Sequence, residues 1–573
     1  MRSLLLFLGL LLLGALPALA QQDDDAPALP DIAPREVEIR GQLDITLPAL
    51  QRPALSGLLP QTQQLEPLPP LPPPDAQALE PPASTPQALA DEAAPSSGFS
   101  DLPAPRTGLV EAGGGRYFSR FARARFDAPL SAQWAVRSRL DYNGTNGFQP
   151  FDDEDVDTSA DVLSGRATLR TERDALSASF TGGGFLGQHR LYGADGGGIP
   201  SANQHPGRDR YGGHAALHLQ TTAGRAALEA RARYDGAQVQ TTVSDAAGEN
   251  VDFGEQRVRG TLNAEAPVAG APFEADVRGS TARLTGSDRP LADGFAGAVS
   301  FLDAGAGAWL LQSEALRVFA GARVMTFANP DDAGGTYVAP ELRAEWRAAP
   351  RLTLYARTDP RAEANLLADR HRENPSLLRE TSPQPTIRTI DAEGGVRAFP
   401  LRALEVHAFG GYRRAPSALF YEEAPGVYER GITAARYGDG RILRAGGAVS
   451  FRRTERLHTS LSVTYRNGTL ADSNADIPYF APVTAEALFA YGFAGGDGRV
   501  QLTGSLESPR PTSRSGDEEV GLFADLDVEG TYAITPAVGL VARIQNLAPG
   551  VLERYDRYPR PPLVFESGLR VQL

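Results

Sequence analysis

The chain has 573 residues, of which 42% are hydrophobic, 45 are proline and 60 are glycine, and its formal net charge is −14. It contains no cysteine, which excludes disulfide frameworks, cysteine zinc sites, iron–sulfur clusters and thiol catalysis. The mean hydropathy is −0.27, and no apolar run after residue 20 is long enough for a spanning helix. These values exclude a helical membrane protein but not a β-barrel, in which only alternate residues face lipid.

The negative charge is concentrated near the N-terminus. Residues 21–106 contain 13 acidic residues and four arginines, a net charge of −9, whereas residues 107–573 carry about −6. All 56 basic residues are arginine, and they form no basic block. We therefore expect no nucleic-acid partner, because acidic segments repel the phosphate backbone.

Residues 1–20 have the pattern of a secretory signal peptide. Arg2 supplies the positive end, Leu4 to Leu13 form a short apolar segment, and Ala18-Leu19-Ala20 is a small-residue cleavage site. An N-terminal membrane anchor is the alternative, but the apolar segment is too short to span a bilayer. The mature chain is expected to begin near Gln21, outside the cytoplasm.

Residues 21–106 form a Pro-rich acidic tail, for which we expect disorder or polyproline II structure in the periplasm. They contain 18 prolines, and proline lacks a backbone donor and fixes φ. Arg35 to Leu50 differs, because apolar residues that include Val37 and Ile39 alternate with polar ones. This segment is a candidate strand for the sheet edge of a periplasmic partner. An unpartnered, extended linker is the alternative.

From residue 107 onward the chain alternates between apolar and polar side chains. Trp134, Val136 and Leu140, for example, alternate with Arg137 and Arg139. Side chains point to opposite faces along a strand, so one face is apolar and the other is charged. The runs are about 9–13 residues long, which exceeds the usual strand of soluble proteins and suits a tilted strand that crosses a membrane.

The connections between these runs alternate between short turns and long loops, as in outer-membrane barrels. The long loops are expected at residues 143–160, 185–210, 236–254, 359–387, 414–440 and 468–483. The runs begin near residues 107, 116, 131, 161, 175, 211, 225, 255, 272, 296, 315, 337, 351, 388, 403, 441, 456, 484, 498, 518, 536 and 563. The sequence therefore predicts an all-β fold, in which residues 107–573 form a transmembrane antiparallel β-barrel of about 22 strands.

Charged residues opposite the apolar face must line the lumen of such a barrel. The candidate lumen-facing residues are Arg137, Arg139, Arg166, Arg170, Glu229, Arg231 and Arg233. Two interpretations are open. The arginines pair with acids such as Asp141 and Glu229 and brace the wall, or they line a path for an anionic solute.

The strand number and the C-terminal segment resemble the TonB-dependent receptors. The segment has an Asn-Leu pair at Asn546, a Tyr-rich stretch around Tyr555 and Tyr558, and a final alternating strand. In that strand Phe565, Leu569, Val571 and Leu573 share one face and are candidates for the signal read by the barrel-insertion machinery. Simple contact with lipid is the other interpretation of this face.

The resemblance implies solute uptake or reception, with a TonB-like energy transducer as a possible partner. The chain departs from the family in two places. Family members carry an N-terminal plug domain where this chain has the Pro-rich tail, and they usually end in an aromatic residue where this chain ends in Leu573. The resemblance therefore leaves energised import open.

No catalytic or metal-binding motif is recognisable. The seven histidines show no metal-ligand spacing, because His214 and His218 lie about 13 Å apart along one strand. The acidic run Phe151 to Asp161 lacks the glycine and terminal glutamate of a calcium loop. We expect neither enzymatic activity nor a cofactor.

We interpret the chain as a barrel for solute uptake in the outer membrane of a Gram-negative-type bacterium, with the lipid bilayer as its environment. A passive porin-like channel is the first alternative, and a structural or adhesive surface protein that acts through its long external loops is the second. An outer-membrane enzyme and a secreted β-sandwich or propeller are less consistent with the pattern. The sequence does not identify the solute.

Overall fold

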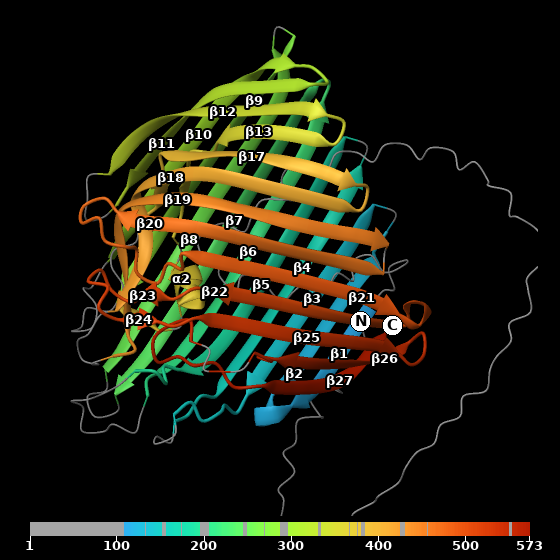
Figure 1. The fold of residues 1–573 in the computed structure, drawn as a ribbon, viewed down its shortest axis with the longest axis vertical. Helices are drawn as coiled ribbons and strands as arrows, with labels where there is room; N and C mark the ends of the chain where they lie inside the picture. The colour runs from blue at the N-terminus through green and yellow to red at the C-terminus, as the bar shows by residue number, and fades with distance from the viewer. Residues whose placement is uncertain are drawn as a thin grey trace, which may run out of the picture. The chain divides into compact units, whose positions relative to one another are not determined.

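A computed structural model of the chain describes residues 108–573 apart from short gaps. The gaps are 132, 152–155, 174, 195–204, 245–248, 269, 287–295, 330–333, 366, 375, 380–383, 424–429, 455, 549 and 551–552. The expected signal peptide and the Pro-rich tail, with Val37 and Ile39, lie outside the described residues. Within them, 22 strands close into one antiparallel β-barrel, as the alternation predicted (Figure 1).

The 22 wall strands follow one another in chain order around the barrel. They are β1 (Gly108–Gly115), β2 (Arg120–Pro129), β3 (Trp134–Thr145), β4 (Ala160–Arg173), β5 (Leu176–Arg190), β6 (Gly207–Ala223), β7 (Ala226–Ser244), β8 (Glu249–Val268), β9 (Ala271–Gly286), β10 (Ala296–Gln312), β11 (Leu316–Ala328), β12 (Gly335–Ala349), β13 (Leu352–Thr358), β17 (Ile390–Leu401), β18 (Leu404–Glu423), β19 (Thr433–Thr454), β20 (Leu457–Leu470), β21 (Val483–Phe493), β22 (Gly498–Glu507), β25 (Phe523–Ala533), β26 (Val538–Gln545) and β27 (Val564–Gln572).

The remaining elements are short and lie in the connections. They are η3 (Arg116–Phe118), β14 (Arg361–Glu363), α2 (Leu367–Glu373), β15 (Leu377–Arg379), β16 (Thr386–Arg388), η4 (Ala494–Gly496), β23 (Arg510–Pro511) and β24 (Glu519–Val520). No helix among the described residues is long and apolar enough to cross a bilayer.

The ring closes where β1 pairs antiparallel with β27, and this seam is tightly packed. Gly113 faces Gly568 across the seam, and the N–H of Leu573 donates to the carbonyl of Gly108 at 2.9 Å. Glu111, which is 3% exposed, accepts a hydrogen bond from Nε of Arg570 at 2.6 Å. Closure leaves no unpaired strand edge, which a bilayer requires.

Both chain ends of the barrel lie at the end that carries the short turns. The connection between β19 and β20, for example, is two residues, whereas β13 and β17 are separated by residues 359–389. Several strands are longer than the expected 9–13 residues, and β19 reaches 22. The predicted loops 185–210, 236–254 and 414–440 are partly strand. In the third of them, for example, the ladder between β18 and β19 continues to Glu423 and Thr433. Bilayer thickness sets only the minimum length of a strand.

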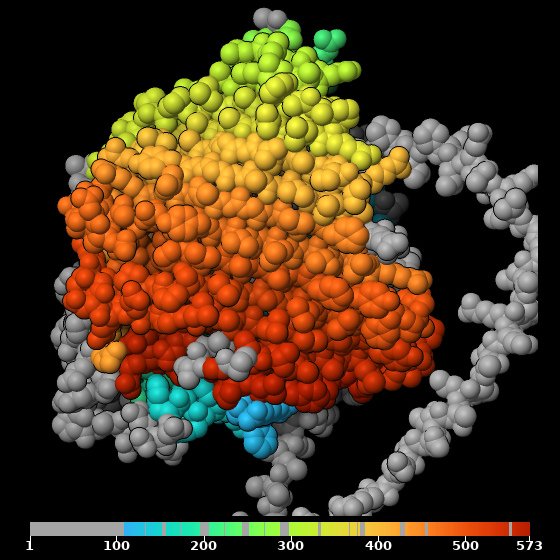
Figure 2. Space-filling view, in the orientation of Figure 1, coloured from blue at the N-terminus to red at the C-terminus, as the bar shows by residue number. Residues whose placement is uncertain are grey.

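The two faces of the wall are reversed relative to a soluble protein. On β20 the apolar Leu461, Val463 and Tyr465 are 43–50% exposed, whereas Arg466 is 8% exposed. The outer surface is continuous over the strands that Figure 2 shows in yellow, orange and red. Apolar side chains in this pattern face lipid, and a closed 22-stranded barrel is an architecture of the Gram-negative outer membrane.

We predict that Gly113→Val prevents closure of the barrel. A Cβ at Gly113 would lie 2.2 Å from the carbonyl oxygen of Ser567 and 2.6 Å from Cα of Gly568. Such overpacking costs about 1–3 kcal/mol or more. The fraction of heat-modifiable, folded protein on electrophoresis should fall sharply. Gly530→Val is the matched control, because a Cβ there meets nothing within 4 Å; equal folding of both variants would contradict the prediction.

Candidate functional site

The connection between β13 and β17 turns into the barrel instead of leaving it. We call these residues, 359–389, the cap. Within the cap β14 pairs with β16, β15 adds in parallel to β19 at Leu377 and Thr433, and α2 lies against β7 and β8 of the facing wall (Figure 1). The sequence predicts an external loop here, and the inward course of this segment corrects that prediction.

Apolar contacts hold the cap against the wall. Leu367 and Leu378 have no exposed surface and pack with Val239, Phe253 and Leu284 from β7, β8 and β9. Full burial of a leucine contributes about 1.5–3 kcal/mol. The segment follows this inward course because its leucines can be removed from water only against the wall.

Buried carboxylates of the wall bind the backbone of the cap. Glu255 on β8 accepts a hydrogen bond from the N–H of Leu367 at 2.7 Å, at the start of α2. Asp303 on β10, which has no exposed surface, accepts from the N–H of Ala362 at 2.9 Å. Asp303 also forms an ion pair with Arg323 at 2.7 Å. A carboxylate at a helix start satisfies a free N–H and complements the helix dipole.

Hydrogen bonds to three further parts of the chain hold the other end of α2. The carbonyl of His371 accepts from Nη1 of Arg210 at 2.9 Å. The carbonyl of Glu373 accepts from the hydroxyl of Tyr555 at 3.0 Å. Nδ2 of Asn374 donates to the hydroxyl of Thr433 at 2.7 Å. The first two bonds satisfy carbonyls that a short helix leaves free. Together the three bonds tie the cap to β6, to β19 and to the connection that contains Tyr555.

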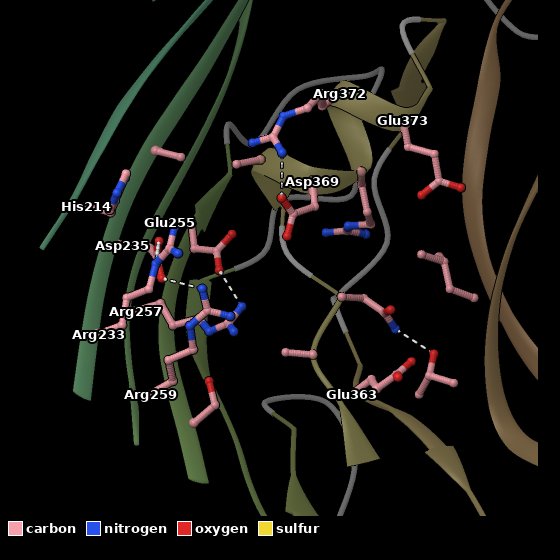
Figure 3. Close-up of a pocket in the computed structure, with 18 of the residues that line it drawn as sticks. His214, Arg233, Asp235, Glu255, Arg257, Arg259, Glu363, Asp369, Arg372 and Glu373 are labelled. Carbon is pink, nitrogen blue, oxygen red and sulfur yellow. Dashed lines mark hydrogen bonds and ion pairs between the residues drawn. The ribbon is translucent and has the colours of Figure 1, made fainter. Parts of the chain in front are cut away.

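A cavity of about 1250 Å³ lies between the cap and the inner wall. Figure 3 shows Arg233, Arg257 and Arg259 of the wall on one side and Asp369 and Arg372 of α2 on the other. The titratable side chains that line it are twelve arginines, six acids and one histidine: Arg123, Arg139, Arg166, Arg210, Arg233, Arg257, Arg259, Arg278, Arg370, Arg372, Arg388, Arg413, Asp141, Asp235, Glu255, Glu363, Asp369, Glu373 and His214.

Strand register sets the arginines of the wall side by side. Arg125, Arg139 and Arg166 are direct partners across β2, β3 and β4. Arg233 and Arg259 face each other across β7 and β8. Like charges directly opposite one another are destabilising, so each such group needs an anion nearby.

The predicted lumen-facing residues fall into two groups. Arg139, Arg166 and Arg233 line the cavity. The other four, which lie on the same faces nearer the short turns, form exposed or half-buried ion pairs: Arg137 with Asp127, Arg170 with Glu172, and Arg231 with Glu229. His218 lies beside Glu229 at 2.8 Å, whereas His214 lines the cavity.

The predicted C-terminal residues share the outer face of β27. Phe565 is 45% exposed, and Leu569 and Leu573 are each 54% exposed. Val571, which is half-buried, faces Val110 of β1 across the seam. This placement suits contact with lipid, and recognition by the insertion machinery stays a prediction.

Sequence reasoning missed the residues that join the cap to the wall. Glu255 and Arg257 continue the same alternation as Arg259 and could have been found by it. Residues 366–378 contain four leucines, which indicate burial. This signal was weaker, because the segment was expected to be a loop in water. No group of three or more His, Asp or Glu side chains suited to a metal ion occurs in the described part of the chain.

Burial shifts three ionisable groups of α2, and it raises the pKa of the Asp369 carboxyl although Arg372 opposes the rise. Burial, assisted by Asp369, raises the pKa of the Glu373 carboxyl to about 8, although Tyr421 and Arg554 oppose the rise. The carboxyl is therefore protonated at neutral pH. Burial, together with Arg208, Arg370 and Arg210, lowers the pKa of the His371 imidazole well below its ordinary range, so that this ring stays neutral.

We predict that rising pH loosens the cap through Glu373. Because its folded-state pKa lies above the ordinary 4.5, attachment of the cap is strongest below pH 4.5 and weakens as the pH rises to about 8. The chain has no cysteine, so Ala368→Cys accepts a single spin label on α2. The mobile fraction of that label should increase about two-fold or more between pH 5 and pH 9. Adding Glu373→Gln should abolish the increase, and an equal increase in both proteins would refute the role of Glu373.

Comparisons with known proteins agree with the fold. No family model and no curated protein matches the sequence. Among solved structures, the copper transporter OprC matches with a TM-score of 0.61 and 15% identity over 81% of this chain and 80% of that one. The FrpB iron transporter from Neisseria meningitidis matches with a TM-score of 0.63 and 10% identity over 81% of each chain. A ferric enterobactin receptor, PfeA from Pseudomonas aeruginosa, matches with a TM-score of 0.60 and 11% identity over 81% and 80%.

At these identities the similarity concerns the fold. The residues that it covers correspond in extent to the 22-stranded barrel, and the structures that it finds are TonB-dependent outer-membrane receptors and transporters. The resemblance that the strand number and the C-terminal segment indicated is thereby confirmed for the barrel: the chain has the barrel fold of the TonB-dependent receptors.

Proposed function

We propose that the chain is an outer-membrane barrel for solute uptake or reception, and that its cap controls passage through the lumen. The observation that carries this proposal is the cap itself, which is buried and hydrogen-bonded across the barrel above a charged cavity. The names of the similar structures, which are transporters and receptors for copper, iron and ferric enterobactin, support the same class of function. We propose no enzymatic activity.

The cap favours a controlled pathway over a passive pore. A passive porin keeps an aqueous channel open, whereas Leu367, Leu377 and Leu378 of this cap are fully buried. An adhesive protein would present its long loops outward. Here the cap turns inward, and Tyr555 and Tyr192 of two other loops also bond to neighbouring loop carbonyls.

A TonB-like energy transducer is the proposed partner on the periplasmic side. The candidate contact is the alternating segment around Val37 and Ile39, which would add as a strand to the partner's sheet. Copurification of the full chain with such a transducer domain should be lost in a Val37→Pro, Ile39→Pro variant. Retention of the partner by this variant would remove the segment from the proposal without affecting the role of the cap.

The main test is single-channel conductance in a planar bilayer. The full chain should show little steady conductance, because the cap occupies the lumen. Replacing residues 364–385 by a short Gly-Ser linker should raise the conductance at least several-fold, since 22 strands enclose a wide lumen. Both proteins must be heat-modifiable, which shows that the barrel is folded.

The result also separates the proposal from its alternatives. Large, steady conductance of the full chain, unchanged by the replacement, would favour a passive porin. Silence of both folded proteins would show that something other than the cap closes the barrel, and the proposed control by the cap would then be wrong.

A further inference from the structure

The cavity beneath the cap holds more positive charge than its own carboxylates neutralise. Its twelve arginines face six Asp and Glu side chains, and one of these, Glu373, is protonated at neutral pH. Elsewhere on the inner wall the balance is reversed. Arg323 alone has Asp276, Asp303 and Glu341 within 3.1 Å. Several arginines of the cavity also have carboxylate partners outside its lining: Arg123 pairs with Glu111, Arg278 with Asp276, and Arg388 and Arg413 with Asp391.

In part of the cavity, arginines pair with carboxylates of the wall, as Arg323 does. Nε and Nη2 of Arg139 donate to Asp141. Asp235 lies 2.7 Å from Nε of Arg233 and 3.5 Å from Nη2 of Arg259. These carboxylates already pair with other arginines, so they cannot compensate the charges of Arg166 and Arg257.

Two other arginines of the cavity have weak carboxylate contacts or none. Arg166 forms no hydrogen bond or ion pair with any described residue. Arg257 is 3% exposed, and its nearest carboxylate, Glu255, is 3.9 Å away. Within the described part of the chain, Nε and Nη1 of Arg257 have no hydrogen-bond partner. Buried donors without hydrogen bonds are costly, so the state of Arg257 points to a ligand that completes it. Arg166 is exposed, so its guanidinium is accessible to such a ligand.

The absence of a side chain at Gly183 leaves room for the His214 ring beside Arg166. Gly183 pairs with Arg166 on one side and with His214 on the other. A Cβ at Gly183 would lie 2.7 Å from the His214 ring and 3.0 Å from Cβ of Arg166. His214, Asp235 and Arg257 then continue the same row across β6, β7 and β8. The row thus has a cation at each end and no side chain at Gly183.

The spacing of the two cations indicates the size of the missing anion. Arg166 on β4 and Arg257 on β8 are four strands apart, which is about 19 Å along the wall. Both side chains line the same cavity. A single small oxyanion would contact one of them, whereas an elongated anion with two or more charged groups would contact both. The cap adds Arg372 from the opposite side of the cavity (Figure 3).

We propose that the cavity binds a multiply charged oxyanion solute, a polycarboxylate or polyphosphate, between Arg166 and Arg257. This inference rests on the proposed uptake function and names the substrate class of that pathway. Guanidinium groups suit carboxylate and phosphate oxygens because they offer paired donors in one plane.

The test is calorimetric titration of the full mature chain in detergent with tripolyphosphate, citrate and orthophosphate at constant ionic strength. Tripolyphosphate, citrate or both should bind, and orthophosphate should bind at least about ten-fold more weakly because it reaches one arginine. Binding of tripolyphosphate alone assigns a polyphosphate solute, and binding of citrate alone assigns a polycarboxylate. If neither binds, or if orthophosphate binds as tightly, the inference is wrong.

The variants localise the binding. The Arg166→Gln, Arg257→Gln double variant should lose at least about ten-fold in affinity, in the range of two charge-assisted contacts. Arg166→Gln alone should lose several-fold, and it keeps the fold because Arg166 has no contact to lose. Arg347→Gln is the matched control, because this exposed arginine lies outside the cavity lining. Equal affinity of the double variant and wild type would overturn the site.

The two proposals fail separately. If replacement of the cap opens the barrel and no polyanion binds, the anion site is wrong and the role of the cap stands. If a polyanion binds through Arg166 and Arg257 and replacement of the cap leaves conductance unchanged, the site stands and control by the cap is wrong.

Discussion

The whole structure depends on the closed hydrogen-bonded ring of strands. In a bilayer no water is available to backbone N–H and C=O groups, so every one must find its partner on a neighbouring strand. The seam between β1 and β27 meets this requirement with glycines at the point of closest approach and with buried Glu111 beside Arg570. Once the ring is closed, its outer face must be apolar and its inner face is the only place for charge.

The charges that collect on the inner face must then be compensated. Register places arginines opposite arginines, as with Arg139 and Arg166, and like charges in that position need counter-ions. The barrel meets the need unevenly. Near the short turns and around Arg323 carboxylates are close by, whereas beneath the cap the arginines outnumber them. Stability accounts for the first arrangement, and ligand binding is the physical reason that we infer for the second.

The cap links these two features. It buries leucines against β7 to β9, and it uses carboxylates of the wall, Glu255 and Asp303, to satisfy its own backbone. A segment of the barrel itself thereby occupies the lumen and encloses the cationic cavity from above. One of its anchors is a single hydrogen bond from the loop residue Tyr555, and Glu373 is held protonated, so its attachment is sensitive to loop movement and to pH.

The sequence by itself determined the barrel. Apolar and polar residues alternate in 22 runs that are joined by connections of alternating length, and a transmembrane β-barrel is the membrane structure that fits this pattern. It also identified Arg139, Arg166 and Arg233 as inward-facing, because alternation is a local property of each strand. It could not decide that residues 359–389 enter the lumen, because that course depends on leucines meeting Val239 and Phe253 from more than a hundred residues earlier. Nor could it separate braced arginines from those left without carboxylates. That distinction depends on register between strands and on the contacts of the cap, which only the tertiary structure brings together.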